Sequence, residues 1–491
     1  MRLFLPSDDL RYAAEQILMS LFPEEKPEYS GTGEGNSAKI TLSQGEKYLT
    51  CTALIARGER TGRGSARVSC HKLTDDLRRG SLTSMIIKLA FYRAARPLLD
   101  RKPAWGALTG IRPGVIFTSL LEKGMSPRAA MGHMERVYYA DRERIEMLSH
   151  TSRASLEVKA ALGRRDIGVY VGIPFCPTRC AYCSFVSLGV EKSRKLIEPF
   201  LDALYREIDR VGEIIRELGL RPVAVYIGGG TPTTLSAEQL TELIERLRAA
   251  FSFRAVTEFC VEAGRPDTIT EAKLRALRAG GVTRVSVNPQ SLSPEVLEAI
   301  GRSHTAGDFR RAYAMTEAVF GGDINTDLIA GLPADTPESF GETLREIVAL
   351  GPANITVHTL ALKKGTRITL DNVPRPGTRE VDAMLTLARQ VLTAAGYRPY
   401  YLYRQKFMSG GFENVGWAKP GKESLYNILI MEELCTILAA GGGASTKLVN
   451  AETGRIERIF DYKYPKEYIE GIEKTLADKE KIKEFYETYE R

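Results

Sequence analysis

Short apolar runs alternate with longer amphipathic stretches over residues 167–359, and this alternation is the strongest pattern in the chain. A short apolar run between turn signals is typical of a buried strand, whereas apolar residues recurring at helical spacing indicate a helix. The runs predict strands at Ile167–Ile173, Pro222–Ile227, Glu258–Ala263, Arg284–Asn288, Asp323–Ile329 and Asn354–Thr359. The stretches between them predict helices at Arg194–Glu217, Ala237–Ala250, Glu271–Ala279, Ala306–Val319 and Pro337–Leu350.

Six strand–helix units of this kind predict an α/β fold built on a parallel sheet. Six strands are too few to close an eight-stranded TIM barrel, so we expect a (β/α)6 partial barrel over residues 165–362. An N-terminal accessory α+β region is expected at 1–150, and a mainly helical region that covers the substrate at 363–491. Sites in parallel α/β barrels lie at the carboxyl ends of the strands, so functional residues are expected there.

The flanking regions carry weaker patterns. The N-terminal region predicts a helix near Asp9–Leu21 and strands at Lys39–Leu42 and Tyr48–Ala56, followed by a basic, glycine-containing turn over 57–65. No function follows from this region. Near the C-terminus, the aromatic, glycine and cationic residues between Tyr400 and Asn427 suit either a lid or a packed domain. The tail over 472–491 predicts a pair of surface helices.

The composition narrows the class of protein. Lys and Arg number 68 against 61 Asp and Glu, a net charge of +7 that is too small and dispersed to indicate nucleic-acid binding. Three of the seven cysteines are clustered and the other four are scattered, which is no disulfide framework. We therefore expect a reducing, cytoplasmic setting. No apolar run is long enough to predict a membrane span.

The three clustered cysteines follow the first predicted strand of the barrel. Cys176, Cys180 and Cys183 form a C-x3-C-x2-C pattern within YVGIPFCPTRCAYCSF. Three thiolates on one tight loop can bind three irons of a four-iron cluster, which leaves the fourth iron open to another ligand. A structural zinc site needs four closed ligands, and a ferredoxin-type carrier needs four cysteines per cluster. The loop has no fourth Cys or His, so neither alternative is favoured.

Other chemistry-bearing residues follow the next predicted strands. Gly228, Gly229 and Gly230 end the second strand, where backbone can approach a ligand and carbonyl groups can accept from an ammonium group. A carboxylate at a strand end can take a ribose hydroxyl pair, and an arginine suits a carboxylate. As a set converging on one rim, these residues favour a bound nucleoside amino acid. The polar members are Glu262, Gln290, Arg302 and Asp327.

The cysteine loop, with an aromatic residue just before its third Cys, resembles the radical S-adenosylmethionine (SAM) superfamily. Together with IGGGTPTTL, VEAGRPD, NPQS, NTDLIAGLP and NVGWAKPGKESLYN, it resembles the oxygen-independent coproporphyrinogen III dehydrogenase family. The HemZ-type branch, which carries an extra N-terminal region, is the most similar. The resemblance covers residues 165–430 or so.

The resemblance implies a cofactor set and its ligands. It implies that Cys176, Cys180 and Cys183 bind a [4Fe-4S] cluster, and that SAM is present as one or two molecules. It implies that Tyr170, Gly229 and Glu262 contact the SAM on the cluster, with Tyr170 and Glu262 in the catalytic set. Contacts of a second SAM are implied for Tyr182, Gly230, Thr231, Gln290, Arg302, Asp327 and Ala361.

The implied reaction is oxidative decarboxylation of coproporphyrinogen III propionates to vinyl groups, which forms protoporphyrinogen IX in oxygen-independent haem biosynthesis. An electron donor such as flavodoxin or ferredoxin is implied as a partner. Cations near the barrel mouth could hold propionates, namely Lys363, Lys364, Arg367 and Arg404.

One residue departs from the family pattern. Phe185 stands where the coproporphyrinogen enzymes carry a further Cys, and relatives lacking that Cys include haem-binding chaperones. A haem-delivery protein, in which His304 or His358 would serve as axial ligand, therefore stays as an alternative. A radical SAM enzyme acting on another tetrapyrrole is a second alternative.

Overall fold

The computed structural model describes residues 1–29, 35–110, 112–184, 188–189, 193–363, 365–405 and 409–489. The chain divides into two compact units. The first comprises residues 1–149 and 410–412, and the second comprises residues 150–409 and 413–491.

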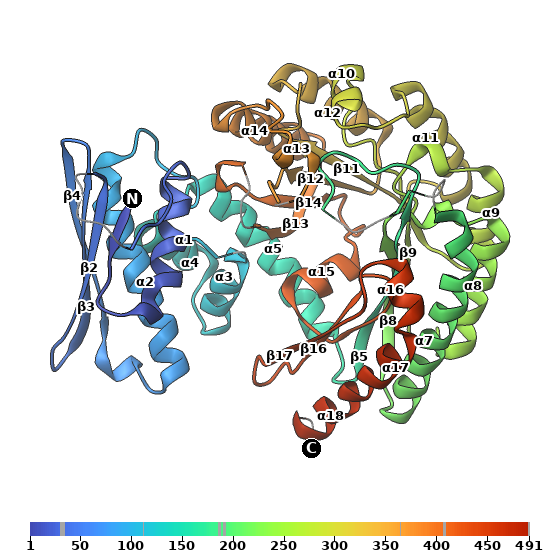
Figure 1. Ribbon diagram of the computed structural model, residues 1–491, viewed down its shortest axis with the longest axis horizontal. Helices are drawn as coiled ribbons and strands as arrows, with labels where there is room; N and C mark the ends of the chain where they lie inside the picture. The colour runs from blue at the N-terminus through green and yellow to red at the C-terminus, as the bar shows by residue number, and fades with distance from the viewer. Residues whose placement is uncertain are drawn as a thin grey trace. The chain divides into compact units, whose positions relative to one another are not determined.

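The first unit is a four-stranded sheet with helices on one face, coloured blue to cyan in Figure 1. Its core is formed by alternate residues of the sheet and the apolar faces of α1 and α2. The strands run in the order β1 (Arg2–Phe4), β2 (Ser37–Gln44), β3 (Tyr48–Arg57) and β4 (Arg60–Ser69). The helices are α1 (Arg11–Leu21), α2 (Asp76–Ala95), α3 (Pro113–Glu122), α4 (Pro127–Tyr138) and the first part of α5 (Arg142–Ala161).

The expectation of a turn over 57–65 is wrong for most of that range. Only Gly58 and Glu59 turn the chain, and β4 begins at Arg60. The glycines that suggested a turn serve close packing instead, because a Cβ at Gly64 would lie 2.3 Å from the carbonyl oxygen of Ala90 in α2. Glycine in this strand lets a helix approach the sheet.

The second unit contains the predicted parallel partial barrel, and this prediction is confirmed. Helices connect successive strands and lie along the outer side of the curved sheet, as α7, α8, α9 and α11 show in Figure 1. The strands are β5 (Asp166–Ile173), β8 (Arg221–Gly229), β9 (Glu258–Glu262), β10 (Arg284–Ser286), β11 (Ile324–Ala330) and β12 (Asn354–Thr359). The connecting helices are α7 (Ile197–Glu217), α8 (Ala237–Ala250), α9 (Glu271–Ala279), α10 (Pro294–Ala299), α11 (Ala306–Phe320) and α12 (Pro337–Leu350).

The region after residue 362 has more helix than strand, as expected, but it also adds five strands that the sequence pattern did not predict. They extend the parallel core at both edges into an eleven-stranded sheet, with β14 antiparallel to β12 and β15 parallel to β5. The strands are β13 (Arg398–Tyr403), β14 (Asn414–Ala418), β15 (Ile437–Gly441), β16 (Ser445–Val449) and β17 (Ile456–Phe460). The helices are α13 (Arg367–Leu370), α14 (Thr378–Ala394), α15 (Leu425–Glu432), α16 (Pro465–Glu470), α17 (Ile472–Asp478) and α18 (Glu480–Tyr489).

Helix α15 lies inside the curve of the sheet, where it contacts β13 as well as β5 and β8 (Figure 1). Its Tyr426 stacks on Tyr226 at a ring separation of 4.6 Å and on Tyr170 at 6.3 Å. The carboxylate of Glu258 accepts hydrogen bonds from Ser424 Oγ and from the backbone N–H of Tyr426, both at 2.9 Å. The helix therefore forms a packed floor within the barrel.

The C-terminal tail forms the expected pair of helices, α17 and α18, and a buried charge between them anchors it. Lys479 is fully buried, and its Nζ lies 2.6 Å from Glu207 of α7 and 2.9 Å from Asp461. Tyr468 donates a hydrogen bond to Glu207 and packs against Phe200. Such a network holds the tail to the barrel because each charge has an opposite partner. In the described part of the chain, no helix is long and apolar enough to cross a membrane.

Candidate active site

The cysteine loop is fastened to the end of the neighbouring strand by backbone hydrogen bonds. Gly230 N donates to Ile173 O at 2.8 Å, and Thr231 N donates to Phe175 O at 2.7 Å. A Cβ at Gly230 would lie 2.5 Å from the Phe175 carbonyl oxygen, so a side chain there would push the two segments apart. The short strand β6 (Phe175–Cys176) thereby places the first cysteine beside the glycine run.

The middle of the loop is also held by backbone. Ala181 N donates to Ile300 O at 2.9 Å, and Ile368 N donates to Ala181 O at 3.2 Å. Cys183 N donates to Cys180 O at 3.1 Å, which closes a turn between the second and third cysteines. Backbone hydrogen bonds therefore fix the position of this part of the loop. Phe185, the residue that departs from the family pattern, lies outside the described residues.

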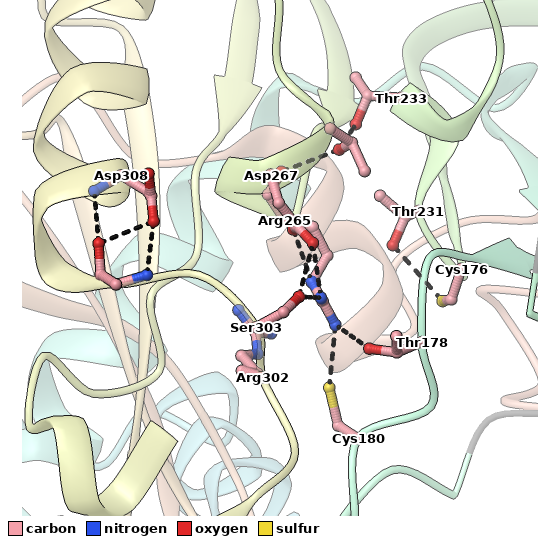
Figure 2. A network of polar contacts seen from close by, with 12 residues as sticks. Cys176, Thr178, Cys180, Thr231, Thr233, Arg265, Asp267, Arg302, Ser303 and Asp308 are labelled. Atoms are coloured by element: carbon pink, nitrogen blue, oxygen red, sulfur yellow. Dashed lines mark hydrogen bonds and ion pairs between the residues drawn. The ribbon is translucent and has the colours of Figure 1, made fainter. Parts of the chain in front are cut away.

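Two of the three cysteine sulfurs face hydrogen-bond donors. Thr231 Oγ1 donates to Cys176 Sγ at 3.4 Å, and Arg265 Nη1 donates to Cys180 Sγ at 3.6 Å (Figure 2). Both donors come from the ends of the strands that follow the loop. Donors and positive charge stabilise a thiolate, which is the form of cysteine that binds a metal.

The donor set fits a four-iron cluster. All three cysteines lie on one loop outside any disulfide of the described residues, and an O–H and an N–H group lie at the sulfurs of Cys176 and Cys180. In such a cluster each cysteine binds its own iron, so the sulfurs need not converge on one point. Within the described ranges, no three His, Cys, Asp or Glu side chains gather closely enough to hold a single metal ion.

Glu262, at the end of β9, carries a half-buried carboxyl group. Burial, followed by the nearby Asp327 charge, raises its pKa from 4.5 to about 8, although hydrogen bonds with Tyr226 and Gly229 N oppose this. Burial also raises the pKa of Tyr170, so its phenol stays neutral. A carboxyl group that is not fully compensated is suited to a positively charged or amino-bearing ligand.

Gln290 and Arg302 present buried polar atoms without protein partners. Gln290 has a left-handed backbone with φ 68°, and its Oε1 has no hydrogen-bond partner among the described residues. Arg302 donates to Asn288 O at 2.5 Å and to Tyr182 Oη at 3.1 Å, but its Nε has no partner within the described part of the chain. Buried polar groups are normally satisfied, so these atoms are available to a polar ligand.

Asp327 and the two histidines proposed as haem ligands, His304 and His358, differ in their surroundings. Asp327 accepts a hydrogen bond from Asn288 Nδ2 at 3.0 Å and lies 3.7 Å from His358 Nε2. His304 is buried, and neither ring nitrogen has a partner among the described residues. Burial and the charges of Arg302 and Arg265 lower the pKa of His304 to about 4, so it is neutral at physiological pH.

Ala361, expected to contact a second SAM, and the cations expected to meet a substrate lie in the segments after β12 and β13. Ala361 is half-buried, Lys363 is exposed, and Lys364 lies outside the described residues. Arg367 is exposed and lies 3.9 Å from Asp371. Arg404 is buried, and this burial, only partly offset by the Glu413 charge, lowers its pKa to about 10. Arg404 is therefore buried, whereas Lys363 and Arg367 are exposed.

Sequence reasoning missed Arg265 and its partners. The residue lies in the quoted VEAGRPD stretch, but nothing in the sequence showed which side chain would face the cysteines. Its guanidinium binds the Asp267 carboxylate through Nε and Nη2, at 2.9 and 2.7 Å. An Arg-Pro-Asp sequence directly after a strand could have drawn attention to this pair, because a bidentate contact fixes an arginine in place.

Comparison with known proteins gives consistent matches. The model of the radical SAM superfamily matches residues 170–347. The chain is 35% identical to the oxygen-independent coproporphyrinogen-III oxidase-like protein HemZ of Bacillus subtilis, over 99% of this chain and 97% of that protein. It is 28% identical to the heme chaperone HemW of Haemophilus influenzae, over 62% of this chain and 76% of that protein.

Among solved structures, the coproporphyrinogen III oxidase HemN of Escherichia coli, a radical SAM enzyme, is similar with a TM-score of 0.53. The two are 25% identical in sequence, and the match covers 66% of this chain and 73% of that one. The similarity to HemZ extends over nearly all of the chain, whereas those to HemN and HemW cover about two thirds of it.

Proposed function

The chain belongs to the radical SAM superfamily and, within it, to the family of the coproporphyrinogen-III oxidase-like protein HemZ, and we propose that it oxidatively decarboxylates coproporphyrinogen III. In this reaction two propionates become vinyl groups, and each loses one hydrogen atom, one electron and CO2. The observation that carries the proposal is the rim beside the cysteine loop. There Gln290 Oε1 and Arg302 Nε have no partner among the described residues, and burial of Glu262 outweighs the hydrogen bonds that its carboxyl group receives. Haem carriage alone does not require such a rim.

The family implies a [4Fe-4S] cluster and SAM, and the residues present fit both. When bound, these cofactors supply the one-electron chemistry that removes hydrogen from the propionate. Cys176, Cys180 and Cys183 would hold the cluster. The Glu262 carboxyl would accept from the amino group of SAM, since that contact replaces the solvation that burial removed.

Gln290 and Arg302 have complementary roles in this proposal. Gln290 Oε1 would accept a hydrogen bond, and Arg302 Nε would donate one, so both would bind polar groups of SAM. Asp327 is already oriented by Asn288 and would accept from hydroxyl groups. The proposal also includes contacts of a second SAM with these residues and with Tyr182, Gly230, Thr231 and Ala361.

Three stacked tyrosines lie beside this rim and would help to keep water from it. Tyr170, Tyr226 and Tyr426 stack on one another with ring separations from 4.6 to 6.3 Å. Burial raises the pKa of each phenol, so all three stay neutral. A neutral aromatic floor excludes water from reactive groups without adding charge, which protects hydrogen abstraction from side reactions.

Exposed cations suit the remaining carboxylates of the substrate. Lys363 follows Ala361 by two residues and is exposed, as is Arg367. Lysine and arginine bind carboxylates through charge-assisted hydrogen bonds. Replacing Lys363 and Lys364 together by Ala should depress decarboxylation far more than SAM cleavage without substrate. Lys466→Ala, a surface change on α16, is the matched control and should alter neither rate.

Anaerobic turnover tests the proposal directly. The cluster-loaded protein, with SAM and a reduced flavodoxin or ferredoxin, is mixed with coproporphyrinogen III, and the products are weighed by mass spectrometry. We expect a product lighter by two CO2 and four hydrogen atoms. Tight haem binding with no consumption of coproporphyrinogen, and sensitivity to His304→Ala, would instead assign the chain to haem delivery.

A further inference from the structure

Arg265 lies at the centre of a buried polar network beside the second cysteine (Figure 2). Only 3% of its surface is exposed. Its Nη1 donates to Thr178 Oγ1 at 3.1 Å and to Cys180 Sγ at 3.6 Å. On its other edge, the guanidinium contacts both carboxylate oxygens of Asp267 and donates to Ser303 Oγ at 3.3 Å. The side chain is therefore held rigidly, with one N–H group aimed at a cysteine sulfur.

The buried guanidinium group of Arg265 does not depend on the contact with sulfur for its partners. The Asp267 carboxylate already offsets its charge, and Thr178 and Ser303 provide oxygen acceptors. Oxygen is a stronger acceptor than sulfur. These partners already satisfy the hydrogen bonding and charge of the arginine, so a purely structural role does not require the N–H···S contact with Cys180.

The sulfur of the first cysteine also faces a buried side-chain donor. Thr231 is buried and directs its hydroxyl at Cys176 Sγ, 3.4 Å away. Arg302 is a second cation near Cys180. The reduction potential of an iron–sulfur cluster depends on hydrogen bonds to its sulfurs, net charge and solvent exposure. Donors and positive charge at cysteine sulfurs stabilise the added electron, so they raise the potential.

We propose that Arg265 is a positioning residue that raises the reduction potential of the cluster through its N–H···S contact with Cys180. The inference rests on the proposed cofactor and concerns how readily the cluster accepts one electron from a donor protein. Asp267 and Ser303 act by holding the guanidinium in place. Removing Arg265 would leave the three cluster ligands intact but make reduction harder.

The test is a redox titration of the cluster followed by electron paramagnetic resonance, without tetrapyrrole substrate. Arg265→Met and Arg265→Gln are compared with wild type after reconstitution to about four irons per chain. We expect the electron-uptake equilibrium to weaken about tenfold, which is about 59 mV more negative for a one-electron couple. Arg310→Met, which removes an exposed arginine paired with Glu346 on α12, should leave the potential unchanged.

Two results would overturn the proposal. One is a wild-type potential in a variant that keeps its four irons. The other is loss of the cluster from both Arg265 variants with the fold intact by circular dichroism, which would make Arg265 a cluster-assembly residue. Failure of coproporphyrinogen turnover leaves this test unaffected, because the titration needs neither substrate nor product.

Discussion

Strand β9 carries two glutamates, one at each end, and they have opposite surroundings. Glu258 and Glu262 are four residues apart, so their side chains point to the same face of the sheet. Glu258 accepts from Ser424 Oγ and from two backbone N–H groups of α15, at 2.9 to 3.1 Å. It also lies 3.4 Å from Arg284. At the other end, Glu262 has a pKa raised to about 8, chiefly by burial.

The two surroundings suit two different roles: Glu258 stabilises the fold, and Glu262 is suited to bind a ligand. A buried carboxylate surrounded by donors joins elements of the fold, as Glu258 joins β9 to α15. A buried carboxyl with too few donors is unfavourable for the isolated protein and becomes favourable when a ligand supplies the missing partner. Gln290 Oε1 and Arg302 Nε, which have no partner among the described residues, resemble the Glu262 carboxyl group in this respect.

The largest expected effect is on stability. Glu258→Ala should lower the free energy of unfolding by about 3–5 kcal/mol, because it leaves Arg284 and the first N–H groups of α15 without their acceptor. Glu262→Ala is the matched control on the same strand and should not lower it, because burial already disfavours the ionised Glu262 carboxyl group. Urea unfolding of the cluster-loaded proteins measures both. Equal destabilisation would show that the two glutamates do not differ in role.

The second effect is on SAM binding. Glu262→Gln should leave the cluster intact and weaken SAM binding by about 1.5–3 kcal/mol, roughly 10- to 150-fold, since one charged hydrogen bond is lost. Equilibrium dialysis under anaerobic conditions gives the affinity. Glu295→Gln, an exposed change in the first turn of α10, is the control and should bind SAM as wild type does. Unchanged affinity in Glu262→Gln would remove Glu262 from the site.

A smaller effect is expected on pH dependence. The folded protein holds the Glu262 proton more tightly than the unfolded chain, so this contribution to stability is full below pH 4.5 and is lost as the pH rises through about 8. SAM affinity should rise over the same range, because ionised Glu262 is the better acceptor. Asp461, whose pKa is also raised to about 8, chiefly by burial, is common to both proteins. The difference between wild type and Glu262→Gln therefore isolates Glu262, and parallel pH profiles would contradict the assignment.

Much of the barrel could be predicted because its signals are local. Each core strand is a short apolar run, and α8, α9 and α12 begin and end where the periodicity does. Strands β14 and β15 were missed because each pairs with a strand far away in the chain, as when Asn354 pairs with Ala418. Strands β13, β16 and β17 join the sheet through these two strands. The glycines of β4 misled for a similar reason, since their purpose is contact with α2.

The site divides in the same way. Cysteine spacing and residues at strand ends can be read from the sequence, so Cys176, Glu262 and Gln290 were found before their surroundings were known. Arg265 and Lys479 were not, because only the fold shows that one faces a cysteine and the other is buried among carboxylates. A charged residue in a sequence gives no sign of whether it is solvated or enclosed.

The central claim, that the rim beside the cysteine loop is a radical SAM site, is tested most directly by reductive SAM cleavage. The protein is reconstituted anaerobically, its iron and sulfide are counted, and 5′-deoxyadenosine is measured after reduction. We predict about four irons per chain with SAM cleavage in wild type, and neither in Cys176→Ala, Cys180→Ala or Cys183→Ala. Replacing Cys51, Cys70, Cys260 or Cys435 should have no effect on either. Stable zinc without iron–sulfur absorbance in the wild type, or cleavage that survives loss of Cys180, would contradict the claim.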